Sequence, residues 1–180
     1  MTDRPDTELM LLAGAEDDED AFSEIVERYQ NVLLNLFLRK GVSSSDGEDL
    51  AQRTFLRLWR YRARYSPRAK FTTFLFLLAN QEALDFFRAA GRRRDLEERF
   101  AAEQEAEGGG RAESAPDGDS VRRAVARLPE GLRDVVELGV FQDLPYADVA
   151  EILGIPRGTV KSRMFHALRK LKEMLDERRS

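Results

Sequence analysis

Apolar residues recur every three or four positions along most of this chain, the spacing of helices that bury one face. The first such stretch carries Phe22, Ile25 and Leu33 on one side and ends at Gly41. The pattern predicts further helices over about residues 48–61 and 72–90, with Gly91 ending the last of them. More helices follow from Ser120 to the end of the chain. We therefore predict an all-α fold.

Composition divides this helical chain into parts. Residues 1–19 end in an acidic run, and residues 96–119 are rich in Glu and Gly, with few side chains able to build a core. The pattern predicts two small helical domains, residues 20–95 and 120–180, joined by a flexible acidic linker over residues 96–119. The acidic segment 1–19 precedes them.

The most informative stretch lies in the second domain, between Leu144 and Leu171. It reads as a short helix, a turn at Gly154 and Pro156, and a longer helix. Glycine accepts positive φ where a helix stops, and proline suits the first turn of the next. In the second helix, one apolar side recurs at helical spacing and is expected to be buried: Val160, Met164, Ala167, Leu168, Leu171 and Leu175. Its opposite, polar face is made of Arg157, Thr159, Lys161, Ser162, Arg163, His166 and Arg169. This is the layout of a helix-turn-helix, whose second helix enters a DNA major groove.

The alternative is an ordinary helical hairpin with a solvated basic face. Cations in the last turn of a helix complement its dipole, which accounts for Arg169. Arg157, Lys161 and Arg163 lie in the first turns, where a positive charge opposes the dipole, so DNA binding is the favoured interpretation.

The predicted helix over residues 48–61 has a second apolar strip beside its buried side. Leu56 and Trp59 lie three positions apart, next to Asp49, Gln52 and Arg53. Such a strip suits a protein-docking surface. A Trp59 that reaches round to the core explains the pattern equally well.

Residues 61–71 form a Pro-broken loop that alternates aromatic and basic side chains. Cations can follow phosphates while flat rings stack on unpaired bases, so the mixture suits single-stranded nucleic acid. A solvated loop whose Tyr rings pack on the core is the alternative.

Charge and composition limit the possible functions. The net charge is −4, yet residues 53–94 carry eleven basic residues and only two acidic ones, and local charge governs contact with nucleic acid. The chain has no Cys, one His and no Gly-rich phosphate loop, so an enzyme is disfavoured, and no metal or cofactor is expected. The start of the chain lacks a signal peptide and no apolar run could span a bilayer, so we expect a cytoplasmic protein.

Two sets of motifs resemble those of the extracytoplasmic-function (ECF) sigma factors, small bacterial initiation subunits with two promoter-reading domains. The first domain has the sequence EDLAQRTFLRLW from Glu48 to Trp59, then FTTFL from Phe71. The second has YADVAEILGIP from Tyr146 to Pro156, then GTVKSR up to Arg163. Three positions depart from the family pattern: Arg53 replaces a frequent acid, Phe74 a common Trp, and Pro145 a usual Ser cap.

The resemblance implies an initiation subunit that directs core RNA polymerase to promoters. Core contacts on the clamp helices of the largest subunit would come from Asp49, Gln52, Arg53, Leu56 and Trp59. Contacts with the promoter's −10 element would come from Tyr61, Arg62, Arg64, Tyr65, Arg68, Lys70, Asn80 and Arg88. The −35 element would be read by Arg157, Thr159, Lys161, Ser162, Arg163 and His166.

The resemblance also implies partners. The polymerase flap would be a second docking site, the linker would run toward the RNA exit channel, and an anti-sigma factor would regulate the protein. A stand-alone helix-turn-helix regulator that ignores core polymerase is the alternative, although such a protein does not need the first domain.

Overall fold

The computed structural model describes residues 4–68, 70–101 and 120–176, and in these ranges every regular element is a helix, as predicted. The predicted linker therefore lies largely outside the described residues. The elements are α1 Asp6–Ala15, α2 Glu19–Arg39, α3 Ser44–Tyr61, the 3-10 turn η1 Arg62–Arg64, α4 Phe71–Ala101, α5 Ser120–Ala126, α6 Glu130–Val136, the π-helical turn η2 Glu137–Phe141, α7 Tyr146–Leu153 and α8 Arg157–Asp176.

Much of the acidic N-terminal segment is helical, since α1 spans residues 6–15. Leu9, Met10 and Ala13 bury one side of α1 against α2 and η1. At its N-terminal end, Asp6 accepts hydrogen bonds from Tyr29 (2.6 Å) and Arg28 (2.7 Å) on α2. Helix α1 is thus part of the first helical group.

Caps define the next two helices. The Asp18 carboxylate accepts a hydrogen bond from the Ala21 backbone amide at the start of α2, and the Ser43 hydroxyl accepts one from the Asp46 amide at the start of α3. Helix α3 thus begins at Ser44, four residues before the predicted start. Gly41 has φ +88° just past α2, the left-handed conformation that the sequence suggested for a helix end there.

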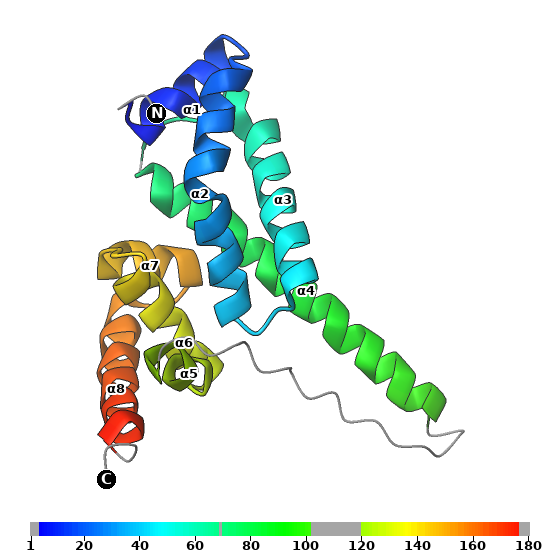
Figure 1. Cartoon of the computed structure of the whole chain (residues 1–180), viewed down its shortest axis with the longest axis vertical. Coiled ribbons are helices and arrows are strands. Elements are labelled where there is room, and N and C mark those ends of the chain that lie inside the picture. Colours follow the sequence, from blue (N-terminus) through cyan, green and yellow to red (C-terminus); the bar gives the residue numbers. More distant parts are fainter. Residues whose placement is uncertain (1–3, 69, 102–119, 177–180) are drawn as a thin grey trace.

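The predicted end of α4 at Gly91 is wrong, because the helix continues to Ala101. Arg and Glu are good helix formers, and they dominate the sequence around this glycine. The distal half of α4 extends away from α2 in Figure 1.

The two helical groups pack against each other. Helix α7 lies against α4, and α5 approaches α2 (Figure 1). The buried apolar side chains of both groups belong to one connected cluster. The sequence predicted two domains but gave no sign of this contact.

Candidate nucleic-acid interface

Helix α3 presents one exposed face that carries four of the five predicted polymerase contacts. Asp49, Gln52, Arg53 and Leu56 are all exposed, and Leu56 is 55% accessible. The opposite side of the helix is buried through Leu50, Thr54, Phe55 and Leu58. The fold therefore leaves Leu56 exposed among polar side chains, on a face of α3 that does not pack on the rest of the protein. An exposed apolar residue of this kind suits a protein-docking face.

Trp59, the fifth residue, lies between the two alternatives that the sequence left open, an exposed docking residue and a core residue. Its ring is half-buried and meets the edge of Phe22 on α2, with ring centres 4.8 Å apart. The Arg62 guanidinium lies over the same ring at 3.8 Å. Trp59 is thus packed partly onto the first helical group, at one end of the exposed α3 face.

The loop after α3 brings together most of the predicted −10 contacts. Tyr61, Arg64, Arg68 and Lys70 are exposed. Tyr65 is half-buried, its ring 5.7 Å from that of Phe74, and burial raises the pKa of its hydroxyl. The loop therefore combines an anchored aromatic with accessible cations.

Arg62 differs from the other cations of this loop. It pairs with Asp17, at 2.6 Å between Nη2 and Oδ1, and donates a second bond to the Trp59 carbonyl oxygen. Its side chain is only 23% accessible. In this structure Arg62 ties the loop to the start of α2 and to α3.

A cavity of about 340 Å³ opens beside this loop. Its walls come from the loop, from α4 and from one residue of α7: Tyr61, Arg64, Tyr65, Ser66, Arg68, Thr73, Phe74, Leu77 and Glu151. The mixture of aromatic rings and guanidinium groups can stack on a flat base and meet a phosphate.

The two predicted −10 contacts on α4 are not brought together on one accessible surface. Arg88 is exposed and pairs with Asp85 at 3.2 Å. Asn80 is only 7% accessible, and its amide donates a hydrogen bond to the Ile152 backbone oxygen of α7 at 3.2 Å. The sequence did not indicate that a helix of the second group would cover Asn80.

The helix-turn-helix forms as predicted. Gly154 takes φ +64° between α7 and α8, and Val160, Met164, Ala167 and Leu171 are buried beneath α8. Leu168, which we expected on the buried side, is instead 51% exposed. Small errors in a 3.6-residue period accumulate along a helix, so positions at the margin of the stripe are the least certain.

Most of the predicted −35 contacts share one accessible face of α8. Arg157, Lys161, Ser162 and His166 are exposed, while Thr159 and Arg163 are half-buried. The Arg163 guanidinium lies against Gly131 of α6, where an added Cβ would come within 3.0 Å of it. Arg163 thus has a packing role in addition to any contact with DNA.

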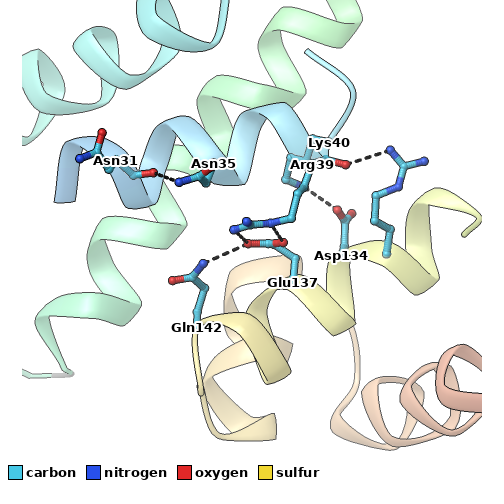
Figure 2. A network of polar contacts seen from close by, with 8 residues as sticks. Asn31, Asn35, Arg39, Lys40, Asp134, Glu137 and Gln142 are labelled. Carbon is cyan, nitrogen blue, oxygen red and sulfur yellow. Dashed lines mark hydrogen bonds and ion pairs between the residues drawn. The ribbon is translucent and has the colours of Figure 1, made fainter. Parts of the chain in front are cut away.

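The structure also contains charged contacts that the sequence analysis missed. Glu137 is 1% accessible and forms a bidentate pair with Arg39, and Lys40 pairs with Asp134 at 2.5 Å (Figure 2). The available signal was a single acid, Glu137, inside the apolar run from Val135 to Leu138. A buried carboxylate needs a partner, so this pattern pointed to a distant cation.

In the part of the chain that the structure describes, His, Asp and Glu side chains nowhere gather in threes that could hold a metal ion. None of the described helices combines the length and apolar character needed to cross a bilayer.

Comparison with known proteins gives matches over both helical groups. A family model described as Sigma-70 region 2 matches residues 25–93, and one described as Sigma-70, region 4 matches residues 118–171. The chain is 31% identical to the ECF RNA polymerase sigma-E factor of Haemophilus influenzae, over 89% of this chain and 88% of that protein. It is 30% identical to the ECF RNA polymerase sigma factor RpoE of Cereibacter sphaeroides, over 96% and 98%.

Two solved structures share the fold. CnrH, solved in complex with the cytosolic domain of CnrY, matches with a TM-score of 0.69 at 23% identity, over 96% of this chain and 97% of that one. The sigma factor RpoE of Bartonella quintana, solved with the anti-sigma factor NepR, matches with a TM-score of 0.65 at 22% identity, over 86% and 96%.

Proposed function

The chain belongs to the ECF sigma factors of the sigma-70 family, and from this premise we propose how its residues divide the work of promoter recognition. A sigma factor directs core RNA polymerase to specific promoters and starts transcription there without being an enzyme itself. Matches to regions 2 and 4 in one chain support this function over a stand-alone helix-turn-helix regulator.

The exposed face of α3 binds core polymerase in this proposal. Asp49, Gln52, Arg53 and Leu56 supply an accessible polar and apolar mixture, with the half-buried Trp59 at its end. An apolar anchor surrounded by polar groups is the usual form of an energetic hot spot. The clamp helices of the largest polymerase subunit are the proposed partner.

The loop after α3 and the adjoining surface of α4 hold the melted −10 strand. Exposed Arg64, Arg68 and Lys70 neutralise phosphates, and the cavity beside Tyr61 and Tyr65 receives an unstacked base. Arg88 extends this surface along α4, whereas Asn80, the other predicted contact on this helix, is covered by α7 in this structure. Arg62 is also one of the predicted −10 residues, but its role in this proposal is to position the loop through its contacts with Asp17 and Trp59.

The exposed face of α8 reads the −35 element in the duplex major groove. Arg157, Lys161, Ser162 and His166 provide donors and positive charge on one side of a helix whose other side is buried. Thr159 and Arg163 lie at the margin of this face. The second helical group also contacts the polymerase flap.

An anti-sigma factor is the proposed regulator. The support is the solved complex of the Bartonella quintana sigma factor with an anti-sigma factor, whose sigma chain has the same fold. We place the protein in the cytoplasm, where core polymerase and chromosomal DNA meet.

The observation that carries this proposal is the likeness to ECF sigma factors over nearly the whole chain. Run-off transcription with purified core polymerase, followed by mapping of the start sites, tests it. We expect initiation at discrete promoters only when the chain is added. A chain that ignores core polymerase yet binds a duplex site tightly by itself would contradict the proposal.

A further inference from the structure

The short turn η1, which follows α3, has two unlike sides. Side chains three positions apart lie on the same side of a 3-10 helix. Arg62 and Tyr65 are half-buried, whereas Tyr61 and Arg64, one position before each of them, are exposed. One side of the turn is therefore attached to the rest of the protein, and the other side is open to a ligand.

Arg62 is held by contacts within the protein. Its Nε and Nη2 donate hydrogen bonds to Asp17 Oδ1 at 2.9 Å and 2.6 Å, and its Nη1 donates one to the Trp59 carbonyl oxygen at 2.9 Å. The Trp59 ring lies against one flat side of the guanidinium, at 3.8 Å. All three guanidinium nitrogens thus donate to protein oxygens, which fixes the group rather than directing it at a phosphate.

Tyr65 is attached to the protein on the same side of the turn. Its ring lies 5.7 Å from that of Phe74 and 6.2 Å from that of Phe71, both on α4. Its hydroxyl oxygen is buried, beside Thr7 of α1. Tyr65 can therefore form a wall of the neighbouring cavity, but α1 and α4 set its position.

Helix α1 and the residues after it supply the surface on which the turn rests. The Arg62 backbone oxygen lies so close to Gly14 that an added Cβ would come within 2.3 Å of it. Asp17 has φ +55°, a left-handed conformation that residues with side chains seldom adopt. Glycine takes this conformation at less cost, so the feature that an aspartate adds here is the carboxylate that reaches Arg62.

We propose that α1 and Asp17 form a platform that positions the −10 loop, with Arg62 and Tyr65 as its two anchors, so that Tyr61 and Arg64 face the melted strand. The inference rests on the proposed −10 role of this loop. A loop already ordered in its binding conformation avoids the cost of ordering when the strand binds. Asp17 is then a positioning residue that aids strand capture, although its own charge opposes a phosphate.

The first experiment neutralises Asp17. The probe is a labelled single-stranded oligonucleotide that carries the −10 element of a promoter mapped by run-off transcription, and its affinity is measured for core polymerase bound to the chain. Asp17→Asn should weaken binding by about two- to fivefold, the range of a partly exposed ion pair. Loss of an acid ordinarily strengthens binding to nucleic acid, so a weaker complex points to positioning. Equal or tighter binding would overturn the proposal.

Two further variants control for charge and for folding. Glu16→Gln removes the charge of the exposed acid next in the chain and should not weaken binding; an equal loss there would overturn the role of Asp17. Asp17→Gly removes the carboxylate but eases the backbone at this positive φ, so its unfolding midpoint in denaturant should stay close to that of wild type. Its strand affinity should nevertheless fall as in Asp17→Asn, and wild-type affinity would count against the platform.

The salt dependence of binding separates an anchor from a phosphate contact. Arg62→Lys keeps the charge but loses the planar fork and the stacking, so it should bind the strand as weakly as Arg62→Ala, with the salt dependence of wild type. Arg64→Ala should instead lower the slope of log affinity against log salt concentration by about 0.7, the value for one phosphate on a single strand. Wild-type affinity in Arg62→Lys, or a lowered slope in Arg62→Ala, would make Arg62 a phosphate contact and not an anchor.

Trp59 provides a readout that needs no polymerase. It is the only tryptophan of the chain, so acrylamide quenching of the free protein's fluorescence reports on the guanidinium over its ring. Quenching should increase in Asp17→Asn and not in Glu16→Gln, and equal quenching in all three proteins would break the link from Asp17 to the loop. A wild-type chain that binds no strand with core polymerase contradicts the proposed function, whereas strand binding that is equal in wild type and Asp17→Asn contradicts this inference alone.

Discussion

The guanidinium of Arg62 lies over the indole ring of Trp59, with its central carbon 3.8 Å from the ring centre. Arg62 also pairs with Asp17 and donates a hydrogen bond to the Trp59 carbonyl oxygen. One side chain thereby links the segment before α2, the end of α3 and the loop that follows α3. Trp59 is consequently both a candidate for polymerase docking and a packed residue. A substitution there would change stability as well as any affinity for polymerase.

Leu56→Ala is the cleaner test of the α3 docking face. Leu56 is 55% exposed, so its truncation should change the free energy of unfolding by no more than about 0.5 kcal/mol. Affinity for core polymerase should fall by about 1–3 kcal/mol if Leu56 anchors the interface. Equilibrium binding to purified core and denaturant unfolding measure the two quantities.

Leu84→Ala, at another exposed leucine but on α4, is the matched control and should leave the affinity for core unchanged. If both variants bind core as wild type does, the docking face lies elsewhere.

Lys161→Ala tests the groove-reading face of α8. Lys161 is exposed, so the fold should persist while promoter-specific transcription falls and affinity for core stays unchanged. Binding of a −35 duplex by the reconstituted holoenzyme should become less dependent on salt, because one phosphate contact is lost. Lys172→Ala, at an exposed lysine on a later turn of the same helix, is the control and should have a smaller effect. A loss of core binding in Lys161→Ala would assign this surface to the polymerase instead.

Local signals in the sequence predicted the local features of the fold. Gly41 and Gly154 both adopt positive φ where helices were expected to stop. Gly91 was also expected to end a helix, yet it lies within α4. Glycine can adopt positive φ but can equally take helical φ, so its presence alone does not end a helix. The apolar stripe of α8 was predicted from its period, with Leu168 as the exception.

Contacts between the two helical groups could not be predicted in this way. Arg39 and Glu137 are 98 positions apart, and no periodicity within either segment relates them. The burial of Asn80 likewise depends on where α7 packs rather than on the sequence around Asn80. The sequence therefore indicated the buried and exposed sides of single helices, but not which exposed sides another helix covers.

Gly14→Ala tests the contact between α1 and the loop after α3. A methyl group at Gly14 would overlap the backbone carbonyl of Arg62, so the loop or the helix must shift. We expect a destabilisation of about 1–3 kcal/mol, as for overpacked positions. Promoter opening should also slow, because the loop that carries Arg64 is displaced. Denaturant unfolding and permanganate reactivity of the −10 region are the measurements.

Gly91→Ala is the opposite case and serves as the control. Outside the helix's own backbone and the two chain neighbours, no atom of the described residues lies within 4 Å of a Cβ at this position, so alanine should stabilise α4 by about 0.5–1 kcal/mol. Equal destabilisation by both substitutions would mean that the close contact at Gly14 is not the cause.

Tyr29 provides a prediction for alkaline pH. Burial raises the pKa of its hydroxyl above the ordinary value of 10.0, and the hydrogen bond to Asp6 acts in the same direction. The unfolded chain therefore loses this proton before the folded chain does, so the free energy of unfolding falls as pH rises past that ordinary value. Tyr29→Phe should cost about 1–3 kcal/mol at neutral pH, where the hydrogen bond to Asp6 is lost, and should show a shallower fall at high pH. Denaturant unfolding at neutral pH and at several alkaline values measures both effects. Parallel slopes for the two proteins would show that the alkaline loss of stability comes from other groups.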